Sequence, residues 1–192
     1  ILKTKLLYFD PKAEVRKQFT KVLHEYESQG IYPEICDYIK QINFVTIDAR
    51  NSENHGVLDP LVFLTGQEAK NLIISMIGEF YDLKQNEQFE KELLQMIEKY
   101  LVLRENGEKV GTKNIMEALT KSDTDRVRIT AELLLEKMSN STLSLCFSNG
   151  QNKAISMSKR ISIIEVTGLE LPTSETSITE NQRQSLVALY AL

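Results

Sequence analysis

Two acidic side chains near the start of the chain have the types and the spacing to do chemistry. Asp10 follows the apolar run Leu6–Phe9, and Glu14 comes four residues later. If that run is a strand that turns into a helix, Asp10 lies at the carboxyl edge of a sheet, where open α/β sheets bind ligands. Glu14 then lies one helical turn deeper on the same face, and such a pair can orient Mg²⁺ or polarise a water molecule. The alternative is structural, with Asp10 capping the helix and Glu14 balancing its dipole.

Two further acids are candidates for the same edge. Asp59 precedes Pro60 in a polar segment after a second predicted strand, and the alternative is a simple loop turn. Glu165 lies within the Ile-rich segment Arg160–Val166, where a buried acid would need a partner. The alternating pattern there favours the other interpretation, a strand-end side chain turned to solvent.

Metal and nucleophilic chemistry find little support. His24 and His55 are isolated, and Cys36 and Cys146 form no Cys-x-x-Cys pair, so we expect no metal site. The segment Gly107–Lys113 has three residues between its glycines instead of four, Thr before Lys, and no strand ahead of it. It is therefore rejected as a nucleotide phosphate loop.

A strand–helix–strand arrangement positions the N-terminal candidates. The sequence predicts a strand at residues 5–9, a helix that Gly30 ends, and a second strand at Asn43–Ile47. We expect Pro11 to take the first helical position, because its missing N–H is not needed there.

The middle of the chain is predicted to be helical, and the chain then returns to strands. Apolar residues at helical spacing predict four helices. The first is capped by Thr65, the second and third span residues 86–104 and 112–119, and the fourth is capped by Asp123. Strands are predicted at residues 144–147, 154–157 and 160–166. Asn149-Gly150 is expected to form a hairpin turn between the first two strands, and a last helix begins at Glu180.

This layout predicts an α/β fold with a helical insertion of about four helices. We divide it into an N-terminal part of an α/β core at 1–64, a helical subdomain at 65–140, and a return to the core at 141–192. The first and last residues look like a strand and a helix in progress, so we expect an excerpt from a longer protein.

Composition narrows the class of protein. The 192 residues carry 23 Lys+Arg and 27 Asp+Glu, a net charge of −4, which argues against a general nucleic-acid binder but leaves room for a local basic patch. Two cysteines fit a reducing compartment. No stretch approaches the roughly 18 apolar residues of a membrane helix.

Three motifs in order resemble elements of a known family. Leu7–Glu14 is similar to the strand ending in Asp-Pro-(Lys/Glu)-Gly-Glu of the HerA/FtsK-like P-loop ATPases, with Ala13 in place of glycine. Gly56–Leu61 resembles the Gly-x-x-Asn-Pro-Phe element of the conjugative-transfer and type IV secretion ATPases, of the fourth VirB component type and its Gram-positive relatives, with Asp59 in place of asparagine. Ile161–Pro172 is similar to their apolar strand with a Leu-x-x-Leu-Pro tail.

The resemblance covers nearly the whole chain and implies a partial RecA-like P-loop NTPase sheet. It implies a parent protein that uses ATP and Mg²⁺ to drive conjugative DNA transfer or type IV secretion, as a hexamer. The phosphate loop would lie before Ile1 and the Walker B acids after Leu192. These residues alone are therefore expected to hydrolyse no ATP and to need no cofactor.

The same resemblance assigns the candidate site. It implies that Asp10 and Glu14 face the γ-phosphate of the nucleotide or its attacking water. Pro11, Asp59 and Glu165 are then residues of the nucleotide edge.

The implied partners are other subunits of the same motor and components of a secretion channel. DNA is a partner that the resemblance allows and the sequence does not show. The implied location is cytoplasmic, with attachment to the inner face of the cell membrane through partner proteins as an option. Two alternatives stay open: a non-catalytic α/β protein-interaction module, and a metal-dependent phosphohydrolase that uses Asp10, Glu14 and Asp59.

Overall fold

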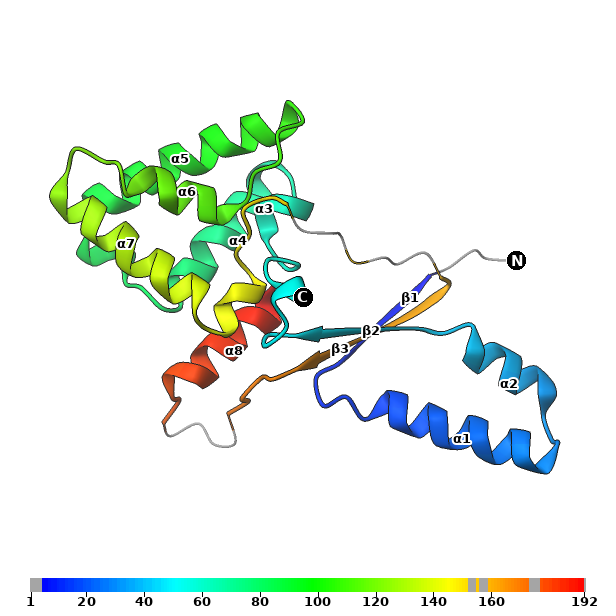
Figure 1. Cartoon of the computed structure of the whole chain (residues 1–192). Coiled ribbons are helices and arrows are strands. Elements are labelled where there is room, and N and C mark those ends of the chain that lie inside the picture. The colour runs from blue at the N-terminus through cyan, green and yellow to red at the C-terminus, as the bar shows by residue number, and fades with distance from the viewer. Residues whose placement is uncertain (1–4, 152–154, 156–158, 173–176, 192) are drawn as a thin grey trace. The chain divides into compact units, whose positions relative to one another are not determined.

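The computed structural model describes residues 5–151, 155, 159–172 and 177–191 (Figure 1). Its contacts divide the chain into two units, Ile1–Asp48 with Ala154–Gly168 and Ala49–Lys153 with Leu169–Leu192. We call the first the sheet unit and the second the helical unit. The fold is of the mixed α/β class, as predicted, and its small parallel sheet is consistent with part of a RecA-like fold.

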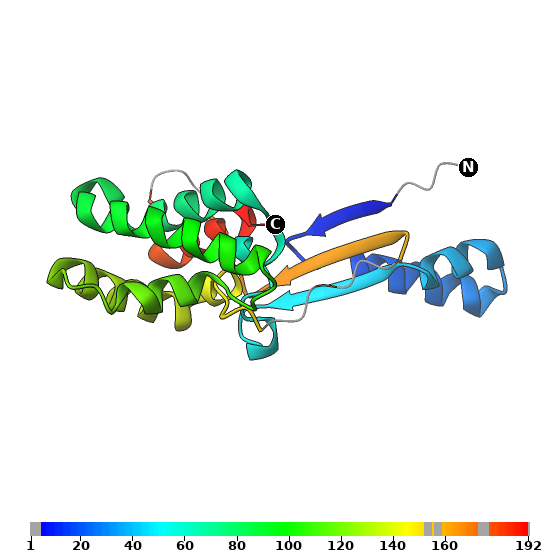
Figure 2. The same cartoon turned by 90° about the horizontal axis from the view of Figure 1, so that it is seen from above.

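The sheet unit holds three parallel strands, which lie side by side in Figure 2. They are β1 (Leu6–Asp10), β2 (Asn43–Asp48) and β3 (Ile161–Thr167), in the order β1-β3-β2. The central strand β3 is an almost continuous apolar run and is nearly wholly buried, as central parallel strands usually are. The strands predicted at residues 5–9, 43–47 and 160–166 are thus confirmed to within a residue or two.

Among the described residues of the sheet unit there are also two helices, α1 (Val15–Gln29) and α2 (Pro33–Lys40). The Phe19 ring of α1 lies 6.2 Å from the Phe44 ring of β2, so α1 packs on the sheet face that carries Phe44. The predicted start of α1 at Pro11 is wrong. Pro11 lies in a turn in which Ala13 has a positive φ of 52°, so helical geometry begins only at Val15.

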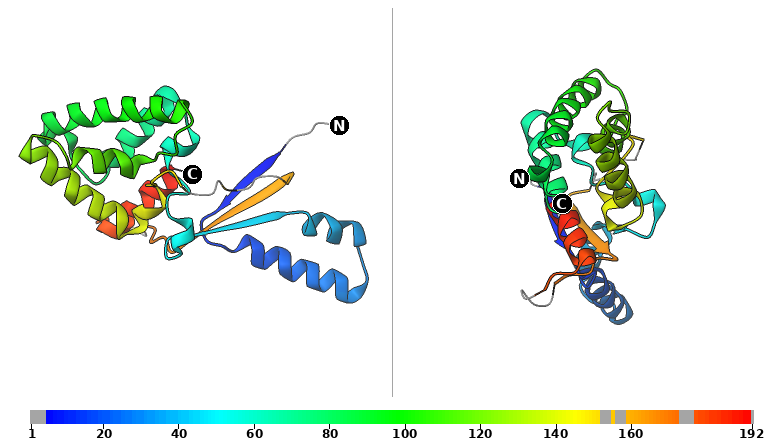
Figure 3. Two further views of the ribbon diagram at one scale, coloured as in Figure 1. Left: turned by 45° about the horizontal axis from the view of Figure 1, so that its top comes forward. Right: turned by 90° about the vertical axis from the view of Figure 1, so that its left-hand side faces the viewer.

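The helical unit contains the remaining helices, and Figure 3 shows how they gather around one another. The α-helices are α3 (Pro60–Phe63), α4 (Gly66–Gly78), α5 (Glu87–Glu105), α6 (Thr112–Leu119), α7 (Asp125–Ser139) and α8 (Glu180–Tyr190). The 3₁₀ turns are η1 (Ser52–Asn54), η2 (Leu83–Gln85) and η3 (Thr142–Leu145). The apolar stripes of α4 to α7 meet in a core whose fully buried side chains include Ile73, Phe89, Leu93, Ile115 and Leu134.

The predicted return to strands after α7 is wrong at residues 144–147. Thr142–Leu145 forms η3, whose start is capped by Ser141 accepting the N–H of Leu143 at 3.2 Å. Because the first of its two predicted strands is a 3₁₀ turn, Asn149-Gly150 does not form the expected hairpin, and Gly150 lies in a bend. A short apolar run suits a buried helical turn as well as a strand, because periodicity cannot separate the two over four residues. The strand predicted at 154–157 lies almost entirely outside the described residues.

None of the helices in the described ranges has the length and apolar character that a membrane crossing requires.

Candidate functional site

The parallel register brings Asp10 and Glu165 together at the carboxyl edge of the sheet. Asp10 is the last residue of β1 and pairs with Glu165 of β3, which also pairs with Thr46 of β2. Partners in register point their side chains to the same face of a sheet. Two carboxylates and a hydroxyl therefore share one face at this edge.

Asp10 is committed to the backbone that follows it. Its side chain is buried, with the residue 4% exposed. Carboxylate Oδ2 accepts the N–H of Val15 at 2.7 Å and Oδ1 accepts the N–H of Lys12 at 3.3 Å. The carboxylate thereby caps α1 from five residues before it, although Asp10 is not the N-cap residue itself.

Glu14 is the residue at the N-cap position of α1, and its side chain makes no capping hydrogen bond. It is exposed, and so is Pro11 in the preceding turn. The helical turn that was expected to align Glu14 with Asp10 is absent, because the helix starts after both. The nucleotide-facing roles of Asp10, Glu14 and Pro11 stay predictions.

Glu165 is buried rather than turned to solvent, so the interpretation that the alternation favoured is wrong. The residue is 3% exposed, and its Oε2 accepts the hydroxyl of Thr46 at 3.0 Å. The same oxygen lies 3.2 Å from Nε of Arg16, which is the partner that a buried acid requires. Its other oxygen, Oε1, is buried without a hydrogen-bond partner among the described residues.

Arg16 was not singled out from the sequence, yet it completes this group. It lies in the first turn of α1, and its guanidinium carbon is 5.2 Å from the centroid of the Phe44 ring. A cation over an aromatic face is favourable, and the contact holds the side chain along the sheet. A buried acid in a central strand was a signal for such a cation, and the helix after β1 was the place to look for it.

Asp59 belongs to the helical unit and is a fully buried structural centre there. It is the N-cap of α3 and accepts the N–H of Leu61 at 2.9 Å. It also accepts the N–H of Thr112 at 2.8 Å, the hydroxyl of Thr112 at 2.7 Å and the N–H of Ser148 at 2.6 Å. The carboxylate thus joins α3, the start of α6 and the segment after η3.

Burial raises the pKa of Asp59 to about 6, because desolvation of the charged form outweighs the hydrogen bonds that Thr112, Ser148 and Leu61 donate. Both carboxylate oxygens already accept two donors each. The sequence indicated the turn with Pro60 but not these partners, which lie 53 and 89 residues away. The place of Asp59 on a nucleotide edge stays a prediction.

The described residues do not offer a complete site for Mg²⁺. No group of three or more His, Cys, Asp or Glu side chains lies close enough within the described ranges to hold a metal ion. The two oxygens of Asp10 are already engaged by backbone N–H groups.

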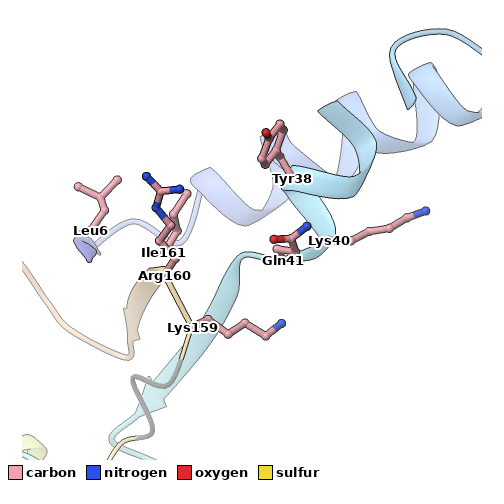
Figure 4. Close-up of a pocket in the computed structure, with 7 residues that line it drawn as sticks. All are labelled: Leu6, Tyr38, Lys40, Gln41, Lys159, Arg160 and Ile161. Carbon is pink, nitrogen blue, oxygen red and sulfur yellow. The ribbon is translucent and has the colours of Figure 1, made fainter. Parts of the chain in front are cut away.

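A cavity of about 780 Å³ opens at the other end of the strands (Figure 4). It is lined by residues at the amino ends of β1 and β3 and at the end of α2, among them Leu6, Tyr38 and Arg160. One of its cations, Lys40, is held by Glu27 at 2.7 Å, and this hydrogen bond raises the pKa of Lys40. The cavity is thus at the edge opposite to Asp10 and Glu165.

Comparison with known proteins shows a family and a relative to which the whole chain is similar. The model of the AAA-like domain family matches residues 1–192. The chain is 31% identical over 195 residues to an uncharacterised protein, YddE of Bacillus subtilis (strain 168), in an alignment that covers 100% of this chain and 24% of that protein. The chain therefore spans about a quarter of the length of this relative. No solved structure matches it significantly.

Proposed function

Because the chain belongs to the AAA-like domain family, we propose that it is an internal portion of an ATP-driven motor. The observation that carries the proposal is the family match over all 192 residues. The carboxyl edge supports it, since parallel α/β sheets bind ligands there. Asp10 and Glu165 are the acids that this edge contributes.

The transported substrate in this proposal is DNA in conjugation or protein in type IV secretion. The support is the order of the three motifs, Leu7–Glu14, Gly56–Leu61 and Ile161–Pro172. The motor works as a hexamer of identical subunits beside secretion-channel components, in the cytoplasm at the inner face of the membrane. Coupling to transport would be tested by deleting the gene and measuring conjugation frequency and secreted protein.

These 192 residues alone are proposed to be inactive. Their sequence contains no Gly-x₄-Gly-Lys-(Ser/Thr) motif, which supplies the backbone cradle and the lysine that hold phosphate groups in P-loop enzymes. In the longer protein that motif and the Mg²⁺ ligands lie elsewhere. This chain contributes the edge that Asp10, Glu14 and Glu165 occupy.

The test compares the full-length protein with residues 1–192 in an ATP hydrolysis assay with Mg²⁺. We expect phosphate release by the full-length protein and none by the shorter one. Hydrolysis by residues 1–192 would disprove the inactive-portion proposal. No nucleotide binding or hydrolysis by the full-length protein would favour the non-catalytic interaction module instead.

Glu14 can be substituted in the full-length protein without loss of a capping hydrogen bond, because its exposed side chain makes none. If it faces the γ-phosphate or the attacking water, Glu14→Gln lowers kcat by about a hundredfold or more, the scale of a general base. Glu34→Gln is the matched control, an exposed acid in the first turn of α2. Equal rates for the two variants would remove Glu14 from the site.

A further inference from the structure

We propose that Arg16 binds a phosphate group at the carboxyl edge of the sheet and that the buried Glu165 positions it. This inference rests on the proposed function, because the phosphate is that of the nucleotide the motor would use. It assigns to this chain a contact that none of the sequence motifs contains, since Arg16 follows the last residue of the N-terminal motif by two positions.

The side chain of Arg16 contacts Glu165 and the Phe44 ring and is also partly exposed to solvent. Its Nε is buried 3.2 Å from Oε2 of Glu165, and its guanidinium carbon lies 5.2 Å from the centroid of the Phe44 ring. The side chain is nevertheless 41% exposed. Its two terminal nitrogens donate no hydrogen bond to any described residue, so both remain available to a ligand.

This arrangement fits an oxyanion better than a neutral ligand. A guanidinium presents two parallel N–H groups that match two oxygens of a phosphate. Because Nε and the ring already restrict the side chain, less rotamer entropy is lost when the phosphate binds.

The position in the fold favours an anion as well. Arg16 lies in the first turn of the 15-residue helix α1, next to the carboxyl ends of β1 and β3. The positive end of the helix dipole and the edge of a parallel sheet are both places where phosphates bind. The free guanidinium is the main contact for the phosphate, and the helix dipole adds to it.

Two nearby carboxylates would oppose an anion if they were uncompensated. Asp10 accepts the N–H groups of Val15 and Lys12, and Glu165 accepts the hydroxyl of Thr46 and faces the charge of Arg16. Each carboxylate is therefore compensated, Asp10 by two backbone N–H groups and Glu165 by one hydroxyl and the charge of Arg16.

Glu165 acts on the ligand only through Arg16. Oε2 of Glu165 lies 3.2 Å from Nε of Arg16. Its other oxygen, Oε1, is buried without a hydrogen-bond donor among the described residues, so the carboxylate charge is balanced mainly by the guanidinium of Arg16. Removing that charge would release the side chain from the sheet without removing the phosphate contact itself. Glu165 is thus a positioning residue, and its effect depends on the presence of Arg16.

The test measures binding of a fluorescent ATP analogue and of adenosine to the full-length protein. We expect Arg16→Ala to weaken binding of the ATP analogue by about tenfold or more, the loss typical of a charged hydrogen bond. Adenosine, which has no phosphate, should bind to both proteins equally. Lys17→Ala is the matched control, because Lys17 is the exposed neighbour of Arg16 on α1, and it should change the affinity less than twofold.

Glu165→Gln keeps the shape and an oxygen for Thr46 but removes the charge. We expect weaker binding of the ATP analogue, unchanged binding of adenosine, and no further loss when Glu165→Gln is added to Arg16→Ala. A purely structural role would lower the urea midpoint, leave the selectivity between the two ligands unchanged and overturn the positioning role.

The outcomes separate this inference from the proposed function. If the wild-type protein binds the ATP analogue and Arg16→Ala equals Lys17→Ala, the inference is wrong and the proposed function stands. If the wild-type protein binds neither ligand, the proposed function fails, and the inference fails with it. If Arg16→Ala does not fold, Arg16→Lys takes its place, since it keeps a charge beside Glu165 and loses the planar fork. Unchanged affinity in that variant would overturn the inference.

Discussion

Glu165 and Asp59 are both buried acids, but their negative charges are compensated in different ways. Glu165 has a neighbouring cation, Arg16, and one hydroxyl donor. Asp59 has four hydrogen bonds from neutral donors and no ion pair in the described part of the chain. A buried carboxylate without a cation keeps a large desolvation cost. That difference makes Asp59 the residue whose protonation should be felt in stability.

Asp59 should make stability fall as pH rises. Its folded pKa of about 6 lies above its ordinary value of 3.8, so the folded state favours the protonated acid. The stabilising contribution is complete below about pH 4 and is lost as pH rises through about 6, a change of about 3 kcal/mol. The measurement is the free energy of unfolding in urea from pH 4 to 7 for the wild type and Asp59→Asn.

The variant supplies the reference, because an amide does not titrate in this range. Asp59→Asn should carry a constant offset, since its NH₂ group faces donors such as the N–H of Leu61. The difference between wild type and variant should shrink with rising pH. A difference that does not vary with pH would contradict the raised pKa.

At this scale the sequence predicts which acids matter better than it predicts their partners. Asp10, Asp59 and Glu165 stand out by their positions next to proline or within an apolar strand. Arg16 and Thr112 do not, because their contacts with these acids depend on how distant segments pack. Glu165 was expected in solvent because alternation along a strand cannot show that a helix covers that face.

The start of α1 depends on Asp10 more than on any residue of the helix itself. Asp10→Ala removes the acceptor of the Val15 and Lys12 N–H groups, so we expect a loss of about 1 kcal/mol. Amide hydrogen exchange should become faster in the first turn of α1. Glu14→Ala is the control, since that side chain makes no capping bond, and an equal effect of both variants would refute the assignment of the cap.

The junction before α6 is closed by contact between two backbone segments. A Cβ built on Gly111 would lie 2.3 Å from the carbonyl oxygen of Ser148, closer than real contacts allow. Gly111→Ala must therefore shift one segment and disturb the Ser148 N–H that Asp59 accepts. We expect a loss of about 2 to 3 kcal/mol in the free energy of unfolding.

Gly78 provides the opposite case within the same unit. A Cβ there would meet nothing within 4 Å, and the residue is helical. Gly78→Ala should stabilise the protein by about 0.5 to 1 kcal/mol. Urea midpoints that move in the same direction for the two variants would contradict this account of the junction.

Helices with several apolar residues at helical spacing could be predicted from the sequence, and the four-residue elements could not. The helices α5 and α6 were found within a residue of their observed bounds. The eight-residue helix α2 and the four-residue α3 were missed, and η3 was taken for a strand. A run of four apolar residues contains barely one helical turn, so its sequence does not distinguish the two structures.

For the molecule as a whole, the composition and the order of the predicted strands and helices indicate the α/β class. They do not show which apolar surfaces remain exposed. The sheet unit leaves large apolar side chains exposed, with Leu6 at 57% and Tyr38 at 67%. A cavity of about 400 Å³ between its sheet and its helices is lined by apolar side chains, among them Leu6, Tyr8, Phe19 and Ile161. A protein of residues 1–192 alone should therefore present this apolar cavity to solvent.

That cavity should bind a hydrophobic dye when residues 1–192 are prepared alone. We expect anilinonaphthalene sulfonate fluorescence to rise with these residues and to fall by about half or more in Leu6→Ser/Tyr38→Ser, because both side chains line or border the cavity. Val102→Ser is the control, an exposed apolar residue on α5 that should leave the signal unchanged. Equal dye binding by the double variant and the unaltered chain would place the exposed apolar surface elsewhere.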